Sequence, residues 1–87
     1  MSDLLPKVLQ EMLTHAEETY SKGDIAKAET EYLLAIDYSS KVYHSSSATT
    51  GLVLLQLLNF YETTGQKHNA AITTGRANAV LTAYRNS

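Results

Sequence analysis

Two groups of side chains in this sequence have types and spacings that could do chemistry. Glu11, His15 and Glu18 are spaced i, i+4 and i+7, so on a helix they share one side. Carboxylate and imidazole groups placed in this way are ligands that a metal ion such as zinc accepts. His44 is followed by the serine run Ser45–Ser47, and histidine and serine are the residue types of a general base and its nucleophile.

Neither group has the partners that such chemistry needs. The histidines His15, His44 and His68 are dispersed, and none has a second histidine at the spacing typical of a zinc site. The serines and His44 are neighbours in one loop, where no third group is placed to orient the base. We therefore expect His15 to lie at the edge of an apolar helix face beside solvated glutamates, and the serines to cap a helix. No catalytic residue, metal ligand or cofactor is predicted.

Composition narrows the function classes further. The chain has 87 residues, no cysteine and a formal net charge of −2, which predicts one domain over residues 1–87 without disulfides. Nucleic-acid binding is not expected, because it needs a basic surface to neutralise phosphates. The N-terminal residues lack the pattern of a secretory signal. The apolar run Leu52–Leu58 is far shorter than the roughly 20 residues that cross a bilayer. The default expectation is a cytoplasmic protein that does not bind membranes.

Three short polar segments divide the chain into four expected helices. These segments are Ser21–Asp24, His44–Ser47 and Thr63–Gln66. Gly23 and Gly65 suit the left-handed residue that ends a helix, and no stretch shows the strict alternation of a half-buried strand. The fold class is therefore predicted to be all-α, with four antiparallel helices. They are expected at about residues 4–20, 25–43, 49–64 and 67–85.

The first, second and fourth of these helices are amphipathic, with one apolar arc each. The arc of the first contains Leu5, Val8, Leu9, Met12, Leu13, Ala16 and Tyr20. The arc of the second contains Ile25, Ala28, Tyr32, Ala35, Ile36, Ser39, Val42 and Tyr43. The arc of the fourth contains Ala70, Thr74, Ala77, Val80, Leu81 and Tyr84. These arcs are the faces that we expect to be buried.

The third helix is apolar around almost its whole circumference. Its narrow polar strip consists of Gln56, Asn59, Glu62 and Thr63. A helix of this kind is normally buried on every side, and three neighbours in so short a chain cannot easily cover it. We expect part of it to contact a second copy, and a homodimer is the simplest such assembly. The expected interface residues are Leu52, Val53, Leu55 and Phe60.

The two halves of the sequence repeat at a spacing of 42 residues. Placing Gly65 over Gly23 also brings Ala70 onto Ala28, and a second alanine pair seven residues later coincides as well. Alanines at i and i+7 lie two turns apart on one face and let paired helices approach closely. Each half is therefore expected to be a helix–turn–helix unit. The two units span about residues 4–43 and 47–85.

This pattern resembles the tetratricopeptide repeat family. The first unit matches the family at Ala16, Gly23, Asp24, Ala28, Tyr32 and Ala35. The second unit matches it at Leu54, Leu57, Leu58, Tyr61, Gly65, Ala70 and Ala77. The family repeats at about 34 residues, and the longer spacing here, with its polar loop, looks like the kinesin-light-chain type. The resemblance covers about residues 10–81, departs from the pattern at Thr19, Ser40 and Thr74, and implies a short right-handed α-solenoid.

The resemblance also implies a groove, because in this family the first helix of each unit lines a concave surface that holds peptides. By position, that groove would contain Leu13, Glu17, Tyr20, Leu52, Leu55, Asn59 and Glu62. Asn59 falls where family members often have an asparagine that bonds the backbone of the ligand. Since Glu17 and Glu62 are acidic, the expected ligand is apolar with some basic character, and not a C-terminal carboxylate.

The charged residues are distributed unevenly along the chain. Residues 1–40 contain eight acidic and three basic side chains, whereas residues 41–87 contain one acidic and four basic ones. Such polarity favours head-to-tail association of copies. Accidental surface composition is the alternative explanation.

Together these patterns predict a non-catalytic protein-interaction module, an adaptor or scaffold. It is expected to bind a partner peptide or helix, to assemble with itself through the third helix, or both. Two alternatives stay open. One is a purely structural homo-oligomer without a separate ligand. The other is a helical bundle of the microtubule-interacting-and-trafficking type, in which a Gly-Asp turn also joins two helices.

Overall fold

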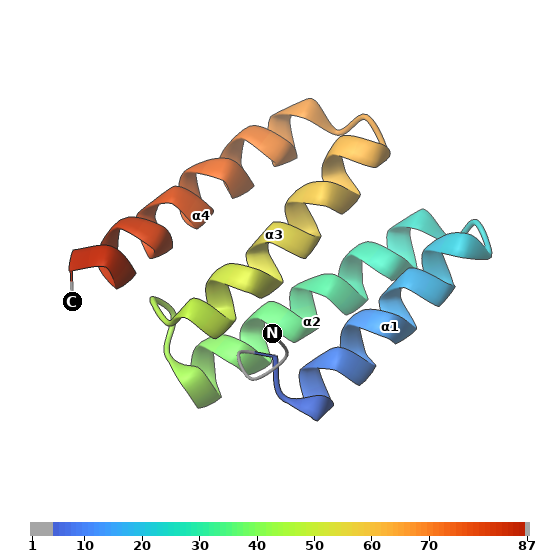
Figure 1. Cartoon of the computed structure of the whole chain (residues 1–87). Coiled ribbons are helices and arrows are strands. Elements are labelled where there is room, and N and C mark those ends of the chain that lie inside the picture. The colour runs from blue at the N-terminus through green and yellow to red at the C-terminus, as the bar shows by residue number, and fades with distance from the viewer. Residues whose placement is uncertain (1–4, 87) are drawn as a thin grey trace.

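The computed structural model describes residues 5–86, and this part of the chain consists of four α-helices and their connections, with no strand (Figure 1). The helices are α1 (Lys7–Ser21), α2 (Ile25–Tyr43), α3 (Ala48–Thr63) and α4 (Lys67–Asn86). The predicted all-α class is confirmed. None of these helices is long and apolar enough to cross a membrane.

The first helix begins later than its apolar pattern suggests. Pro6 stands just outside α1 with φ −55° and ψ 155°, and its carbonyl accepts the N–H of Gln10 at 3.0 Å. A proline disfavours helical geometry in the residue before it, so Leu5 cannot continue the helix backward. The predicted start at residue 4 lies outside the described residues.

The helices lie side by side in chain order, with α1 and α4 at the two ends of the row (Figure 1). The closest packing is between consecutive helices: α1 with α2, α2 with α3, and α3 with α4. Helix α3 is thus covered on two flanks by its own chain, whereas α1 and α4 each have one free flank.

The turns that join α1 to α2 and α3 to α4 have the same backbone hydrogen bonds. Gly23 and Gly65 adopt positive φ angles of 90° and 74°. Each glycine N–H donates to the carbonyl three residues earlier, and the next N–H donates to the carbonyl five residues before it. This is the Schellman arrangement that ends a helix. Every bond of the first turn recurs 42 residues later, so the predicted repeat spacing is present in the geometry of the turns.

We expect Gly65→Ala to lower the free energy of unfolding by about 1–2 kcal/mol, the cost of placing a Cβ in left-handed geometry. Gly75 is the matched control, because it lies within α4 and an added Cβ there meets nothing within 4 Å. Gly75→Ala should raise the free energy of unfolding by about 0.5–1 kcal/mol. Urea denaturation measures both. Equal shifts of the same sign would show that turn geometry is not the cause.

The core lies between the facing sides of the four helices. Its buried apolar residues are Leu9, Leu13, Ala16, Ala28, Tyr32, Ala35, Ile36, Val53, Leu54, Leu57, Phe60, Tyr61, Ala77 and Val80. Half of the large side chains in this set belong to α3, which has a neighbouring helix on each side. Close approach of α3 and α4 depends on Gly51, where an added Cβ would lie 3.2 Å from Cγ1 of Val80.

Five residues of the predicted buried faces are instead exposed. They are Val8, Ile25, Val42, Thr74 and Leu81. The free flanks of α1 and α4 leave Val8, Thr74 and Leu81 uncovered, whereas Ile25 and Val42 lie at the two ends of α2. On α4 the buried threonine is Thr73, whose hydroxyl donates to the carbonyl of Asn69 at 2.8 Å. The side chain of Tyr84, also predicted to be buried, lies outside the described part of α4.

A network of hydroxyl groups fixes the connection between α2 and α3. Ser47 caps α3, as the serine run predicted, because its Oγ accepts the N–H of Thr50 at 3.1 Å. The Thr50 hydroxyl donates to the carbonyl of His44 at 2.7 Å. Its Oγ1 also lies 2.7 Å from Oγ of Ser39, and both of these side chains are fully buried. The network holds His44 at a positive φ of 79°. It therefore fixes the orientation of the α3–α4 pair relative to the α1–α2 pair.

Candidate protein-binding groove

A shallow hollow of about 280 Å³ lies between α1 and α3. It is lined by Leu5, Gln10, Leu13, Thr14, Glu17 and Gln56. Leu13 is buried and contributes apolar surface, whereas Glu17 is exposed and places a carboxylate there. Two of the predicted groove residues, Leu13 and Glu17, are therefore brought together in one hollow.

The α3 residues predicted for the groove form a strip along that helix. Leu52 is half-buried, and Leu55, Asn59 and Glu62 are exposed. At the repeat spacing of 42 residues, this strip corresponds to the α1 strip that carries Leu13 and Glu17. Glu62 lies apart from the first hollow and lines a second one between α3 and α4. The groove therefore has one defined hollow and an accessible extension along α3.

Tyr20, the remaining predicted groove residue, packs into an aromatic cluster. It is half-buried, and its ring meets that of Phe60 edge-on with centroids 5.7 Å apart. The ring of Tyr32 lies 5.0 Å from Phe60 on another side. Tyr20 thus joins α1 to α3 at one end of the molecule and offers only part of its ring to a ligand.

Two residues predicted to contact a second copy are buried within one chain. Val53 is 0% exposed and Phe60 is 3% exposed. The prediction is wrong for both, because neighbouring helices and the tyrosine rings already cover them. Leu55, by contrast, is 41% exposed, and Leu52 is half-buried. Most of the apolar surface of α3 is thus covered by other helices of the same chain.

The carboxylate of Glu17 affects the ionisation of Tyr32, which belongs to the aromatic cluster. Burial raises the pKa of Tyr32 above its usual value of about 10, and the nearby Glu17 carboxylate and then Tyr20 raise it further. A carboxylate beside apolar and aromatic surface favours a ligand that carries a positive charge next to an apolar group.

Tyr61 makes the polar contact between α2 and α3 at the same end. Its hydroxyl donates to Oε2 of Glu29 at 2.7 Å. Burial raises the pKa of Tyr61 most, the hydrogen bond to Glu29 and its negative charge add to the rise, and Arg76 opposes it. The neutral phenol is therefore the form that the fold stabilises.

We expect the protein to lose stability as the pH rises above about 10. The pKa of Tyr61 and that of Tyr32 are higher in the folded chain, so their stabilising effect is complete below the unfolded pKa and declines above it. Tyrosinate absorbance should show fewer than six groups ionising near pH 10 before unfolding. Tyr61→Phe should make the loss of stability with pH less steep. Ionisation of all six tyrosines together near pH 10 in the folded chain would contradict this.

The residues that suggested metal binding are arranged differently. His15 Nε2 lies 3.0 Å from Oε2 of Glu31 on α2, across the contact between the two helices. Within the part of the chain that the structure describes, no cluster of three or more histidine, cysteine or acidic residues could hold a metal ion. Glu31 was not singled out in the sequence, because only the paired geometry of α1 and α2 brings it to His15.

The sequence did not predict Leu5, Gln10, Thr14 and Gln56 as lining residues of the hollow. Gln10 donates from Nε2 to the carbonyl of Leu5 at 2.6 Å, which ties the start of α1 to the hollow. The signal for Gln56 was its place in the polar strip of an otherwise apolar helix.

Comparison of the chain with protein-family models, curated proteins and solved structures gives no match.

Proposed function

We propose that this protein is a non-catalytic interaction module whose groove between α1 and α3 binds a peptide with apolar and basic side chains. The observation that carries the proposal is the hollow in which Leu13 supplies apolar surface and Glu17 supplies a carboxylate. Among its described lining residues, Glu17 is the one charged group. A basic side chain next to an apolar one complements that combination.

The shape of the hollow favours a peptide over an enclosed small molecule. Its volume of about 280 Å³ is small for a ligand cavity, and it is shallow. The extension along α3 offers Leu55 and Asn59 on the same strip, so an elongated ligand would gain contacts beyond the hollow. The amide groups of Gln56 and Asn59 are donors and acceptors suited to a peptide backbone.

We further propose that the chain consists of two tetratricopeptide-like units in a short solenoid. Packing of consecutive helices in chain order supports this, as do the matching Schellman turns 42 residues apart. Ala28 and Ala35 are fully buried where α2 meets its neighbours, which is the role that small residues have in close helix pairs.

A structural homo-oligomer without a separate ligand is the second candidate. The exposed Leu55 favours it, since a large apolar side chain on the α3 strip is suited to contact with another chain. Under this candidate, selected peptides would not bind the groove.

The test is a peptide selected from a random display library, with its affinity measured by fluorescence anisotropy. We expect selected peptides to combine Lys or Arg with apolar residues. Glu17→Lys should weaken binding roughly five- to tenfold, because it places a like charge beside the ligand. Glu18→Lys is the matched control, with the same charge change one residue away and outside the hollow. Equal weakening by the two variants, or peptides without basic residues, would count against the groove.

A further inference from the structure

We infer that the free flank of α4 binds the free flank of α1 from a second copy, so that copies stack head to tail. The stacking would reuse the geometry by which α3 packs on α2 inside one chain. This surface is separate from the groove, and the inference does not depend on the proposed peptide binding.

Helix α2 contacts α3 at several points, three of which are specific interactions. Glu29 accepts from the Tyr61 hydroxyl, Tyr32 packs on the Phe60 ring, and Ser39 meets the Thr50 hydroxyl. The contacts are Glu29–Tyr61, Tyr32–Phe60 and Ser39–Thr50.

The same positions one repeat later along the chain lie on α4. The α4 residues 42 positions after the three α2 residues are Ala71, Thr74 and Leu81, and all three are exposed. Leu81 has 39% of its surface accessible, although it is a large apolar side chain. The surface that α3 covers on α2 is therefore uncovered on α4.

A hollow between α3 and the first half of α4 borders this uncovered surface. It measures about 480 Å³ and is lined by Tyr61, Glu62, Gly65, Lys67, Ala70, Ala71 and Thr74. Forty-two residues earlier, the corresponding surface includes Tyr20 and Tyr32, whose rings lie 5.7 Å and 5.0 Å from Phe60. The hollow in the second unit thus corresponds to a site in the first unit that the Phe60 side chain of α3 occupies.

The α1 helix of a second copy is the occupant that fits this surface. At the repeat spacing, the α1 residue equivalent to Thr50 is Val8, and the one equivalent to Phe60 is Glu18. The equivalent of Tyr61 is Thr19, which is buried within the chain, so the stacking would use the first two positions. Val8 is 48% exposed and Glu18 is also exposed. Stacking α1 of a second copy on α4 would bring Val8 against Leu81, so that two exposed apolar side chains bury each other.

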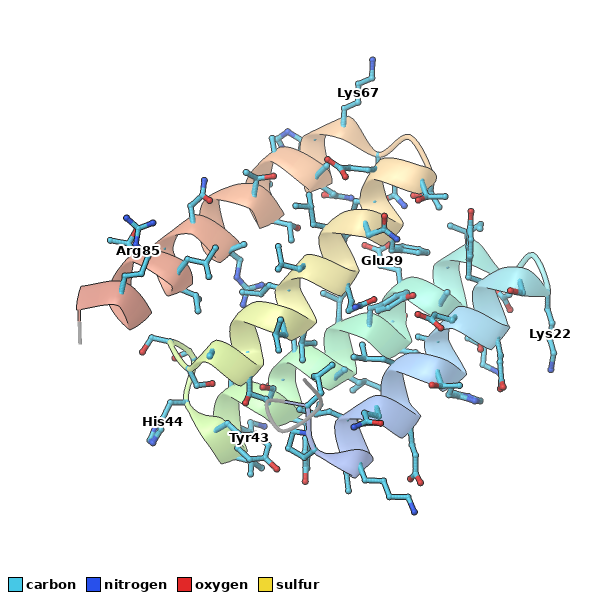
Figure 2. All side chains as sticks on the ribbon, in the orientation of Figure 1. Lys22, Glu29, Tyr43, His44, Lys67 and Arg85 are labelled. Atoms are coloured by element: carbon cyan, nitrogen blue, oxygen red, sulfur yellow. The ribbon has the colours of Figure 1, made fainter. Side chains whose placement is uncertain are left out.

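Charge favours the same occupant. Helix α4 carries three basic residues and no acidic one, and Figure 2 shows Lys67 and Arg85 projecting outward near its two ends. Helix α1 carries three glutamates against one lysine. Glu18 of the second copy would enter the hollow lined by Lys67, with Glu62 opposing part of that attraction. The opposite net charges of the two helices therefore favour this pairing.

Head-to-tail contact between two different flanks does not close into a dimer. Each added copy presents a new α4 flank, so the average mass should keep rising with protein concentration. This differs from the homodimer through α3 that the sequence alone predicts.

Sedimentation equilibrium over a wide concentration range, with two charge variants, tests the inference. Leu81→Glu removes the α4 contact and Val8→Glu removes the α1 contact, and each alone should weaken association roughly tenfold or more. An equimolar mixture should form a 1:1 pair and nothing larger, because each variant keeps one intact flank. Leu34→Glu is the matched control, since Leu34 is 56% exposed on α2 and outside both flanks. It should associate like the parent chain.

Three results would overturn the inference. The first is a parent chain that stays monomeric at every concentration, and the second is one that stops at a dimer. The third is a mixture of the two variants that does not pair. Circular dichroism on each variant checks that it is folded, and none of the substitutions touches the lining of the α1–α3 hollow. Failure here would therefore leave peptide binding intact.

Discussion

Leu54→Ala is expected to lower the free energy of unfolding by about 2–5 kcal/mol. Leu54 is 1% exposed at the centre of α3, where it is among the largest fully buried side chains. Truncation removes apolar contacts and leaves a cavity that the surrounding helices fill only in part. Small domains are stabilised by about 0.05–0.15 kcal/mol per residue, so the loss is a large share of the total for 87 residues.

The next residue along the chain is the matched control. Leu55 is 41% exposed, and Leu55→Ala should change the free energy of unfolding by no more than about 0.5 kcal/mol. Urea denaturation followed by circular dichroism measures both variants. Similar losses for the two would show that α3 does not turn its Leu54 side toward the core.

Thr50→Val is the second substitution with a large expected effect, about 1–3 kcal/mol of lost unfolding free energy. Valine keeps the shape of threonine but removes the hydroxyl that lies 2.7 Å from Oγ of Ser39 and bonds the His44 carbonyl at 2.7 Å. Ser39 is fully buried, so its own hydroxyl would lose that partner. The loss of unfolding free energy is large because a buried polar group without a hydrogen-bond partner is unfavourable.

A double-mutant cycle separates this bond from packing. Ser39→Ala and Thr50→Val together should cost less than the sum of the two single changes, because the double variant leaves neither hydroxyl without its partner. We expect a coupling of about 0.5–1.5 kcal/mol from denaturation of all four proteins. Strict additivity would mean that the two hydroxyls do not interact.

Local signals explain why the four helices were predictable. The turns at Gly23 and Gly65 need a positive φ, and the caps need side-chain oxygens at Asp24 and Ser47. Both requirements involve only a few neighbouring residues, so they can be recognised from the sequence. The start of α1 was less predictable, because the apolar pattern continues before the point where Pro6 prevents helical geometry.

The environment of α3 depended on tertiary packing. A helix that is apolar all round has no periodicity from which to tell which side meets its own chain. Val53 and Phe60 therefore looked as available as Leu52 and Leu55, and only the positions of α2, α4 and Tyr20 separate the buried pair from the accessible one.

The candidate groove was partly predictable for a similar reason. Leu13 and Glu17 were found because their helical spacing places them on one strip of α1. Gln56 needed the position of α3 beside α1, and His15 needed Glu31 from a different helix. Contacts between different helices are the part that spacing along one helix does not encode.

The most direct test of groove binding follows the backbone amide signals by NMR while a selected basic, apolar peptide is added. We predict that the largest changes fall on Leu13, Glu17, Leu55 and Asn59, along the strip formed by α1 and α3. Changes concentrated at Ala71 and Thr74 on the outer flank of α4, with the α1–α3 strip unaffected, would contradict the proposed function.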